Sequence, residues 1–291
     1  MYNYSFIIPH KNSPGLLQRC LDSIPSYDDI QVIIVDDNSD ENKVDFSCFP
    51  GLDRDNTVCI FNKEGKGAGH ARNLALKKAT GKWLVFADAD DYFAPSFKDI
   101  LEKYREDDDT DMVFFNYCKV TSSGAMITLP ITRHISNYNK GRMFSEKVLR
   151  YSAWSPWSRM VKRELSESNN ILFEELPFSN DMMFVLRNTA LAANIRAENI
   201  MAYYYYCPST GTQTSVHYYN PHNIRLRMEG TLKLWNFYKG VGYPFIRPVW
   251  MSERDLGIKA DKNLRKQYGF RCFYNFRDTI NYLIAKIFKI L

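Results

Sequence analysis

The sequence predicts an α/β protein with a mostly parallel central sheet sandwiched between helices. Between residues 4 and 117, short apolar runs alternate with segments of helical periodicity, which is the pattern of successive strand–helix–strand units. Several runs are continuously apolar, such as residues 32–35, as strands covered on both faces should be. We therefore expect strands over residues 4–9, 31–35, 58–61, 83–87 and 112–117.

Two helices are expected between the early strands. Ser13 followed by Pro14 is a typical helix start, and the segment after it carries an apolar stripe formed by Leu16, Leu17, Cys20, Leu21 and Ile24. A second helix is expected over residues 69–79, with Gly81 as the signal that ends it. After residue 117 the sequence becomes aromatic-rich and irregular.

The composition excludes several classes of protein. Hydrophobic residues make up 45% and charged residues 24% of the 291 positions, which is typical of a packed globular chain and not of a disordered one. The six cysteines form no CxxC pair, so we expect reduced thiols. No apolar run approaches the ~20 residues of a membrane span, and the N-terminus has no secretory leader. The chain is expected to stay in the cytoplasm.

The net charge of +5 is concentrated at the C-terminal end. Residues 262–291 contain seven Lys/Arg and one acid, so they carry +6 and residues 1–261 carry −1. From residue 273 onward apolar residues recur at helical spacing, which predicts a basic amphipathic helix that binds anionic lipid headgroups. Packing of this helix on the rest of the chain is the alternative. No recognition motif accompanies the charge, so no nucleic-acid partner is expected.

Polar residues that directly follow the apolar runs are the candidates for ligand binding, because ligands of open α/β sheets bind at the carboxyl ends of strands. Asp88, Asp90 and Asp91 lie within four residues. Three such carboxylates repel one another unless a cation neutralises them, and Mg²⁺ or Mn²⁺ prefers oxygen ligands of this kind. Asp36 and Asp37 end another strand and can accept hydrogen bonds from a base or a ribose, although Asp-Asp-Asn-Ser is also a good turn sequence.

A glycine-rich segment, residues 65–69, leads into the helix that carries Arg72. It offers a flexible backbone, a positive helix end and an arginine that can face phosphate. It is not a dinucleotide-binding fingerprint, since no GxGxxG follows the first strand, and the chain has no GxxxxGK[ST] phosphate loop.

Taken in order, these motifs resemble the family 2 inverting glycosyltransferases, which have the GT-A fold. The matching segments are Ile7-Ile8-Pro9, Val35-Asp36-Asp37-Asn38-Ser39, Ala71-Arg72-Asn73, Phe86-Ala87-Asp88-Ala89-Asp90-Asp91, residues 157–165 and residues 171–181. The resemblance implies a glycosyltransferase domain over residues 1–215, with a nucleotide-binding half (1–119) and an acceptor half (120–215). A helical extension with the basic tail is expected over residues 216–291.

The resemblance implies a donor site for a nucleotide-diphospho-sugar, most simply a UDP-sugar. In such a site Pro9, Asp36 and Asp37 hold the base and ribose, and Arg72 adds a contact to the nucleotide-sugar. Asp90 is then the direct ligand of Mn²⁺ or Mg²⁺, and Asp88 faces the ribose, the sugar or a metal-bound water. The chemistry agrees, because a divalent cation stabilises the charge that builds on a leaving diphosphate.

An inverting transfer also needs a base that takes the proton from the acceptor hydroxyl. The resemblance assigns this role to Asp181, the second residue of a pair that is usually Glu-Asp or Asp-Asp. Here the first residue is Asn180, which departs from the pattern. The alternative for Asp181 is a helix cap. Trp157 and Asn180 are possible contacts for the acceptor or the sugar, although large aromatic side chains are more often core.

We therefore expect a cytoplasmic, metal-dependent inverting glycosyltransferase, peripheral on the inner face of the membrane, that acts on a lipid-linked or growing surface polysaccharide. One alternative is a sugar-phosphate nucleotidyltransferase, which would need a glycine-rich basic loop that residues 10–14 do not supply. The other is a non-catalytic, nucleotide-sugar-binding subunit of a polysaccharide assembly complex, which only Asn180 supports.

Overall fold

The computed structural model describes residues 1–208 and 221–243. The chain divides into two compact units, residues 1–209 and 210–291. In the second unit the described element is helix α9 (Pro221–Gly240). The predicted domain boundary at residues 215/216 and the predicted amphipathic tail from residue 273 both lie outside the described residues. No helix in the described ranges is long and apolar enough to cross a bilayer.

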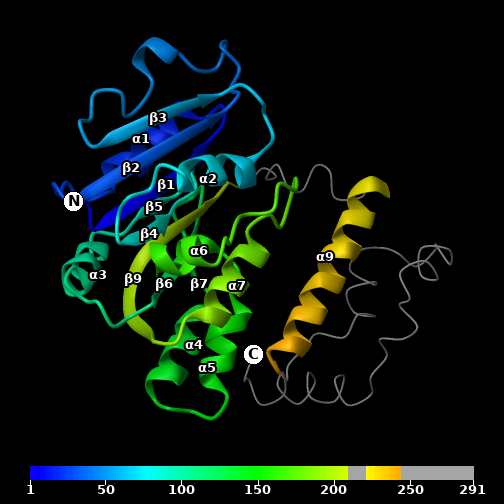
Figure 1. The fold of residues 1–291 in the computed structure, drawn as a ribbon. Coiled ribbons are helices and arrows are strands. Elements are labelled where there is room, and N and C mark those ends of the chain that lie inside the picture. The colour runs from blue at the N-terminus through cyan, green and yellow to red at the C-terminus, as the bar shows by residue number, and fades with distance from the viewer. Residues whose placement is uncertain (209–220, 244–291) are drawn as a thin grey trace. The chain divides into compact units, whose positions relative to one another are not determined.

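A single mixed sheet forms the centre of the first unit (Figure 1). Its strand order is β3-β2-β1-β4-β8-β6-β9-β5, with β7 paired to β6. The strands are β1 (Tyr4–His10), β2 (Ile30–Asp37), β3 (Thr57–Asn62), β4 (Trp83–Phe86), β5 (Tyr92–Phe93), β6 (Met112–Thr121), β7 (Met126–Thr128), β8 (Arg159–Lys162) and β9 (Ile195–Cys207).

The five predicted strands are β1, β2, β3, β4 and β6, and each differs from its predicted bounds by a few residues at most. β1, β2, β3 and β4 pair in parallel, as expected. The later part of the sheet is different, because β8 runs antiparallel to both β4 and β6, and β5 runs antiparallel to β9. The apolar pattern did not predict β5, β7 or β8, which are only two to four residues long, or the 13-residue β9, which pairs in parallel with β6.

Helices cover both faces of the sheet, which explains the continuously apolar strands. Alternate residues of β1 and β2 belong to two separate buried clusters: Phe6 and Val32 lie in one, and Ile7 and Ile33 in the other. Helices α1 (Pro14–Asp22) and α3 (Phe97–Tyr104) contribute to the first cluster. The second cluster contains residues of α2 (Ala68–Leu76), α4 (Pro130–Asn139), α5 (Ser145–Ser152) and α7 (Met182–Leu191). The short helix α6 (Arg163–Ser168) follows β8.

The interpretation of Gly81 as a helix stop is wrong. Helix α2 ends at Leu76, earlier than predicted, and Gly81 lies beyond it in the turn to β4. A side-chain Cβ at residue 81 would lie only 2.5 Å from the carbonyl carbon of Tyr4, and the Gly81 N–H donates to Ser5 Oγ at 2.8 Å. Glycine is required here because the backbones of the turn and β1 approach closely. The other predicted helix is confirmed, since Leu17, Cys20 and Leu21 are buried along α1 and Ile24 is buried just beyond its end.

Candidate functional site

The carboxyl ends of β1, β2 and β4 lie at the same edge of the sheet. β1 pairs in parallel with both neighbours, with His10 opposite Asp36 and Ile7 opposite Phe86. The register therefore brings the predicted polar segments after these strands to one place, as expected for parallel neighbours. Pro9, the predicted base contact, is the one partly exposed residue of the otherwise buried β1.

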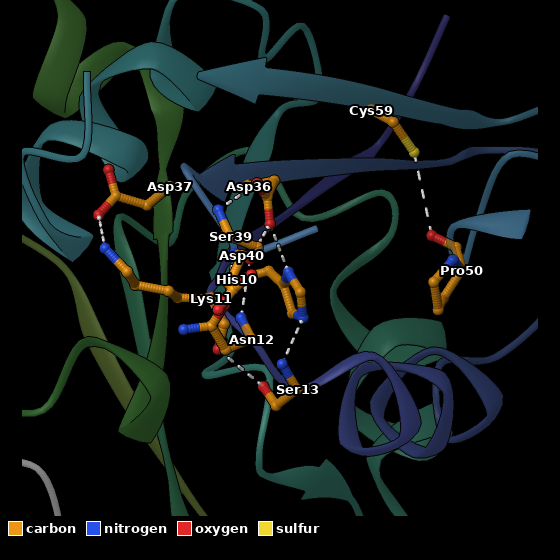
Figure 2. A network of polar contacts seen from close by, with 10 residues as sticks. All are labelled: His10, Lys11, Asn12, Ser13, Asp36, Asp37, Ser39, Asp40, Pro50 and Cys59. Atoms are coloured by element: carbon orange, nitrogen blue, oxygen red, sulfur yellow. Dashed lines mark hydrogen bonds and ion pairs between the residues drawn. The ribbon is translucent and has the colours of Figure 1, made fainter. Parts of the chain in front are cut away.

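His10 holds Asp36 at the first of these strand ends (Figure 2). The Ser13 N–H donates to His10 Nε2 at 3.0 Å, so the proton of the neutral ring sits on Nδ1, which donates to Asp36 Oδ1 at 2.8 Å. Ser39 adds a hydroxyl donor to Oδ1 at 2.5 Å and an N–H donor to Oδ2 at 3.0 Å. No sequence pattern indicates this role for His10, because its partner is 26 positions away.

Burial raises the pKa of Asp36, but the hydrogen bonds from His10 and Ser39 outweigh this effect and leave it below the ordinary value. Asp36 is only 2% exposed, yet it is ionised at neutral pH because its pKa stays below the ordinary value. The carboxylate acts as an anchor for the loop after β2. Since Oδ2 accepts only the Ser39 N–H among the described residues, it has a lone pair left for a ligand.

Asp37 ties the glycine-rich segment to β2. Its Oδ2 accepts the Gly67 N–H at 2.9 Å and lies 3.6 Å from Lys11 Nζ (Figure 2), while Asn62 donates to Oδ1 at 3.4 Å. Gly67 has φ +92° at the N-cap of α2, a conformation that favours glycine. Asp37 is 3% exposed. Because its carboxylate binds the N-cap residue Gly67, it helps to set where α2 begins.

Arg72 connects two predicted site residues that lie far apart in the sequence. Its Nη2 donates to Asp88 Oδ1 at 2.5 Å, and its Nη1 donates to Asn180 Oδ1 at 2.9 Å. The guanidinium lies 5.3 Å from the ring centre of Phe173, and the residue is 5% exposed. The sequence predicted a contact to the nucleotide-sugar for Arg72 but not this bridge.

Asp91 fastens the turn after β4 to β9. It is fully buried, and it accepts the Tyr203 hydroxyl at 2.7 Å and the Tyr206 N–H at 2.8 Å. The Tyr203 hydroxyl in turn accepts the Asp88 N–H at 3.0 Å. Burial, together with the charges of Asp88 and Asp90, raises the pKa of Asp91 well above its usual value. Of the three acids in this turn, Asp88, Asp90 and Asp91, it is Asp91 that holds the turn in place.

Arg19 of α1 supports the same turn, and sequence reasoning missed it. Its Nη2 donates to the Asp90 carbonyl at 2.6 Å, and the guanidinium lies over the rings of Tyr92 and Tyr206, 4.7 and 4.6 Å from their centres. Cation–π contacts of this kind add to the hydrogen bond. No sequence signal marks Arg19, because its partners come from two other parts of the chain.

Asp88 and Asp90 are left as the candidate metal ligands. Asp90 is exposed on the surface, but the protein around its carboxyl and the charge of Asp88 raise its pKa. A divalent cation would relieve this repulsion. Residues 1–208 and 221–243 contain no group of three His, Cys, Asp or Glu side chains that could hold a metal. Two carboxylates nevertheless fit Mg²⁺ or Mn²⁺, because such ions take their remaining oxygens from substrate phosphates and water.

Asp181 occupies the N-cap position of α7, but its side chain makes no capping hydrogen bond. Burial raises the pKa of Asp181, the positive charge of Arg72 opposes the rise, and the negative charge of Asp88 adds to it. Burial also lowers the pKa of nearby Arg159 to about 9, while the charges of Tyr117 and Asp181 act in the opposite direction. Because it makes no capping hydrogen bond, the Asp181 carboxyl does not act as a helix cap.

Trp157 belongs to a buried aromatic cluster. It is 7% exposed, and its ring plane lies within 13° of Tyr203 and 14° of Tyr205, at centroid distances of 4.9 and 5.5 Å. Tyr117 packs edge-on at 4.6 Å. The cluster adjoins the turn held by Asp91, because Tyr203 belongs to both. A contact between Trp157 and a sugar stays a prediction.

The fold and its acidic strand ends place the chain among the α/β proteins that bind ligands at this edge of a sheet. A family model, Glycosyl transferase family 2, matches residues 5–169, which is more than half of the chain. The chain therefore belongs to glycosyl transferase family 2.

Curated relatives agree with this membership. The chain is 26% identical over 188 residues to the uncharacterized glycosyltransferase EpsJ of Bacillus subtilis, covering 62% of this chain and 54% of EpsJ. It is 24% identical over 229 residues to the poly(ribitol-phosphate) beta-N-acetylglucosaminyltransferase TarS of Staphylococcus aureus, covering 77% of this chain and 39% of TarS. The chain thus spans little more than half of EpsJ and less of TarS.

Solved structures confirm the GT-A type of fold. The TarS 1–349 complex with UDP-GlcNAc superposes with a TM-score of 0.59 at 18% identity, covering 98% of this chain and 79% of that one. A mannosyltransferase of Pyrobaculum calidifontis in complex with GDP-Man and Mn²⁺ gives 0.55 at 17% identity, covering 99% and 87%. At these identities the likeness concerns the fold alone.

The His10–Asp36 contact generates a prediction about acid stability. Asp36→Asn should lower the free energy of unfolding at pH 7 by about 1.5–3 kcal/mol, because charge-assisted hydrogen bonds are lost. The pKa of folded Asp36 lies below 3.8, so its contribution is present above pH 3.8 and is lost as the pH falls through the lower folded value. The difference between wild type and variant should therefore shrink below pH 3.8.

Urea unfolding from neutral pH into the acid range measures both effects. Replacement of the exposed Asp53 by Asn is the control and should leave the curve near wild type. A stability difference that stays constant at all pH values would show that Asp36 does not act through its charge.

Proposed function

We propose that the protein is a metal-dependent, inverting glycosyltransferase that moves a sugar from a UDP-sugar to a surface glycan. One observation carries the proposal: a single guanidinium, that of Arg72, holds Asp88 on one side and the segment Asn180–Asp181 on the other. Arg72 thereby connects a candidate metal ligand and a candidate base at the carboxyl edge of the sheet, where open α/β sheets bind ligands.

The donor site is proposed at the ends of β1 and β2. The partly exposed Pro9 and the spare acceptor capacity of Asp36 and Asp37 suit a base and a ribose. A UDP-sugar is supported by the TarS structure, which is a complex with UDP-GlcNAc.

The metal is proposed to bind Asp90 directly, with Asp88 as a second ligand or as a contact to the ribose, the sugar or a metal-bound water. A bound Mn²⁺ or Mg²⁺ supplies Lewis-acid stabilisation of the leaving diphosphate. Arg19 and Asp91 hold the turn that presents both acids. The Mn²⁺ in the mannosyltransferase complex supports the choice of cation.

Asp181 is proposed as the general base. Its carboxylate takes the proton of the acceptor hydroxyl while that oxygen bonds to the anomeric carbon and the bond from this carbon to the diphosphate breaks. Attack from the face opposite the leaving group inverts the anomeric centre. The raised pKa of Asp181 suits this role, because a carboxylate with a higher pKa is a stronger base.

A surface polysaccharide, free or lipid-linked, is the proposed acceptor. Support comes from the relatives that act on poly(ribitol-phosphate), in Bacillus spizizenii and Staphylococcus aureus. The nucleotidyltransferase alternative would need a glycine-rich basic loop after β1. It lacks support, because the segment found there is instead hydrogen-bonded to the fold through His10 and Ser13. A measurement of donor turnover by the purified protein decides between an enzyme and a non-catalytic binding subunit.

A thermal-shift screen of UDP-, GDP- and dTDP-sugars, with and without Mn²⁺, tests the donor and the metal together. A ligand that binds only the folded state stabilises it, by about 2.7 kcal/mol at a hundred times its dissociation constant. We expect UDP-sugars with Mn²⁺ to raise the melting temperature most. Asp90→Asn should abolish the Mn²⁺-dependent part of the shift while the free protein melts near wild type.

An unchanged Mn²⁺ dependence in Asp90→Asn would contradict the metal assignment alone. Wild-type protein that no nucleotide-sugar stabilises would contradict the donor assignment.

The base assignment is tested by Asp181→Asn. Turnover of the donor should fall by the ~10² to 10⁴ typical of general-base loss, because the amide cannot accept the proton. The affinity for UDP, measured by calorimetry, should stay near wild type. A variant that keeps full turnover, or that loses UDP binding instead, would move the base role to another residue.

Association with a membrane is proposed from the charge of residues 262–291. The protein should sediment with anionic vesicles at low salt and be released at high salt, because each Lys or Arg near such a surface contributes about 1 kcal/mol that salt screens. Replacement of Lys286 and Lys289 by Glu should weaken sedimentation. Equal binding to neutral and anionic vesicles would refute this electrostatic contact.

A further inference from the structure

The Arg72 guanidinium spans two parts of the site that the backbone does not connect. It reaches Asp88 in the turn after β4 through Nη2 and Asn180 in the segment before α7 through Nη1. Because the group is planar and rigid, its two hydrogen bonds fix the distance between these partners. Both contacts are partly shielded from water, since the Arg72 side chain is 6% exposed and that of Asp88 is 32% exposed.

The segment before α7 is closed on itself and packed against α2. Within it, the Glu174 N–H donates to the Asn180 carbonyl at 3.0 Å, and Asn180 Nδ2 donates to the Leu176 carbonyl at 3.3 Å. A Cβ at Gly69 would lie 2.2 Å from the Glu174 carbonyl oxygen, so only glycine permits this approach. Asp181 follows directly, and α7 begins one residue later. The position of Asp181 therefore depends on how this segment is anchored.

Asn180 contributes two different hydrogen bonds to that anchor. Its Oδ1 is a neutral acceptor for Arg72, while Asp88 supplies the negative charge that Arg72 needs. An aspartate at position 180 would keep an acceptor for Arg72 but could not donate to Leu176. An alanine would lose both bonds. The contact with Arg72 crosses 108 positions of sequence, whereas the contact with Leu176 is local.

We propose that Asn180 is the positioning residue of the candidate base: its amide oxygen, through Arg72, holds Asp181 in a fixed relation to Asp88. This inference rests on the proposed function, in which Asp181 is the base. Position 180 then requires a hydrogen-bond acceptor for Arg72 and does not require a charge. The amide found here is compatible with full activity and is not the mark of a non-catalytic protein.

The test compares Asn180→Ala, Asn180→Asp and a matched control, Asn169→Ala. Asn169 also donates through Nδ2 to the carbonyl four residues earlier, that of Leu165, at 2.9 Å, but it is exposed and has no contact with Arg72. The readouts are UDP release from UDP-N-acetylglucosamine and UDP-glucose with Mn²⁺, and UDP affinity by calorimetry. Turnover is expressed per UDP-binding molecule, which removes the effect of any unfolded fraction.

Asn180→Ala should lower kcat ten- to a hundredfold, roughly the cost of a misplaced catalytic group, with UDP affinity within about twofold of wild type. Asn180→Asp should retain kcat within about threefold, because Arg72 keeps its acceptor. Asn169→Ala should match wild type. The inference is overturned if Asn180→Ala keeps full kcat, if Asn180→Asp falls as low as Asn180→Ala, or if the loss appears in UDP affinity alone.

Hydrogen exchange of residues 174–181 gives a second readout that needs no substrate. Asn180→Ala and Arg72→Lys should each accelerate exchange there, and the double variant should add little, because the two side chains act through one contact. Additive effects, or no acceleration of exchange, would refute the inference that the contact between Asn180 and Arg72 anchors this segment. Wild-type protein that releases UDP from neither donor would instead count against the proposed function, while the exchange data still decide the role of Asn180.

Discussion

A buried positive charge organises the site. Arg72 is almost fully removed from water, and an uncompensated guanidinium in that place would cost several kcal/mol. It is compensated by one charged partner, Asp88, and one neutral partner, Asn180, from different regions of the chain. Because the cation must keep these partners, α2, the turn after β4 and the segment before α7 are held together even though β4 and α7 are almost 100 residues apart.

The acids of this edge differ in how strongly the fold itself engages their carboxyl groups. Asp36 accepts hydrogen bonds from His10 and Ser39, Asp37 accepts one from Gly67, and Asp91 holds the turn after β4 against β9. The pKa values of Asp90 and Asp181 are raised by the protein around their carboxyl groups and by the charge of Asp88, and neither carboxyl makes a strong internal contact like that of Asp91. The acids that the fold engages thus hold rigid the edge on which the other acids are presented. This is the arrangement that pre-organised sites require.

Short-range pattern was enough to predict the first half of the fold. The apolar runs of β1, β2 and β4 reflect burial on two faces, and the stripe on α1 reflects burial on one. Such burial follows locally from side-chain type. The second half resisted prediction because three of its strands are only two to four residues long and its pairings join distant parts of the chain. β8 pairs antiparallel with β4, and β9 pairs in parallel with β6. Gly81 was misread for the same reason: the neighbour that demands glycine is Tyr4, which is close only in space.

The sequence by itself determined which chemical groups are available: the acids after β2 and β4, the arginine on α2, and the Asn180–Asp181 pair at the start of α7. Their order along the chain was also sufficient to indicate the family. Only the tertiary structure decided how they are used, because hydrogen bonds join atoms that are near in space whatever their separation in the chain. His10 on Asp36, Arg19 on the Asp90 carbonyl and Arg72 on Asn180 cross 26, 71 and 108 positions. No periodicity or local motif encodes contacts over such distances, so which acids the fold itself engages appears only in the folded protein.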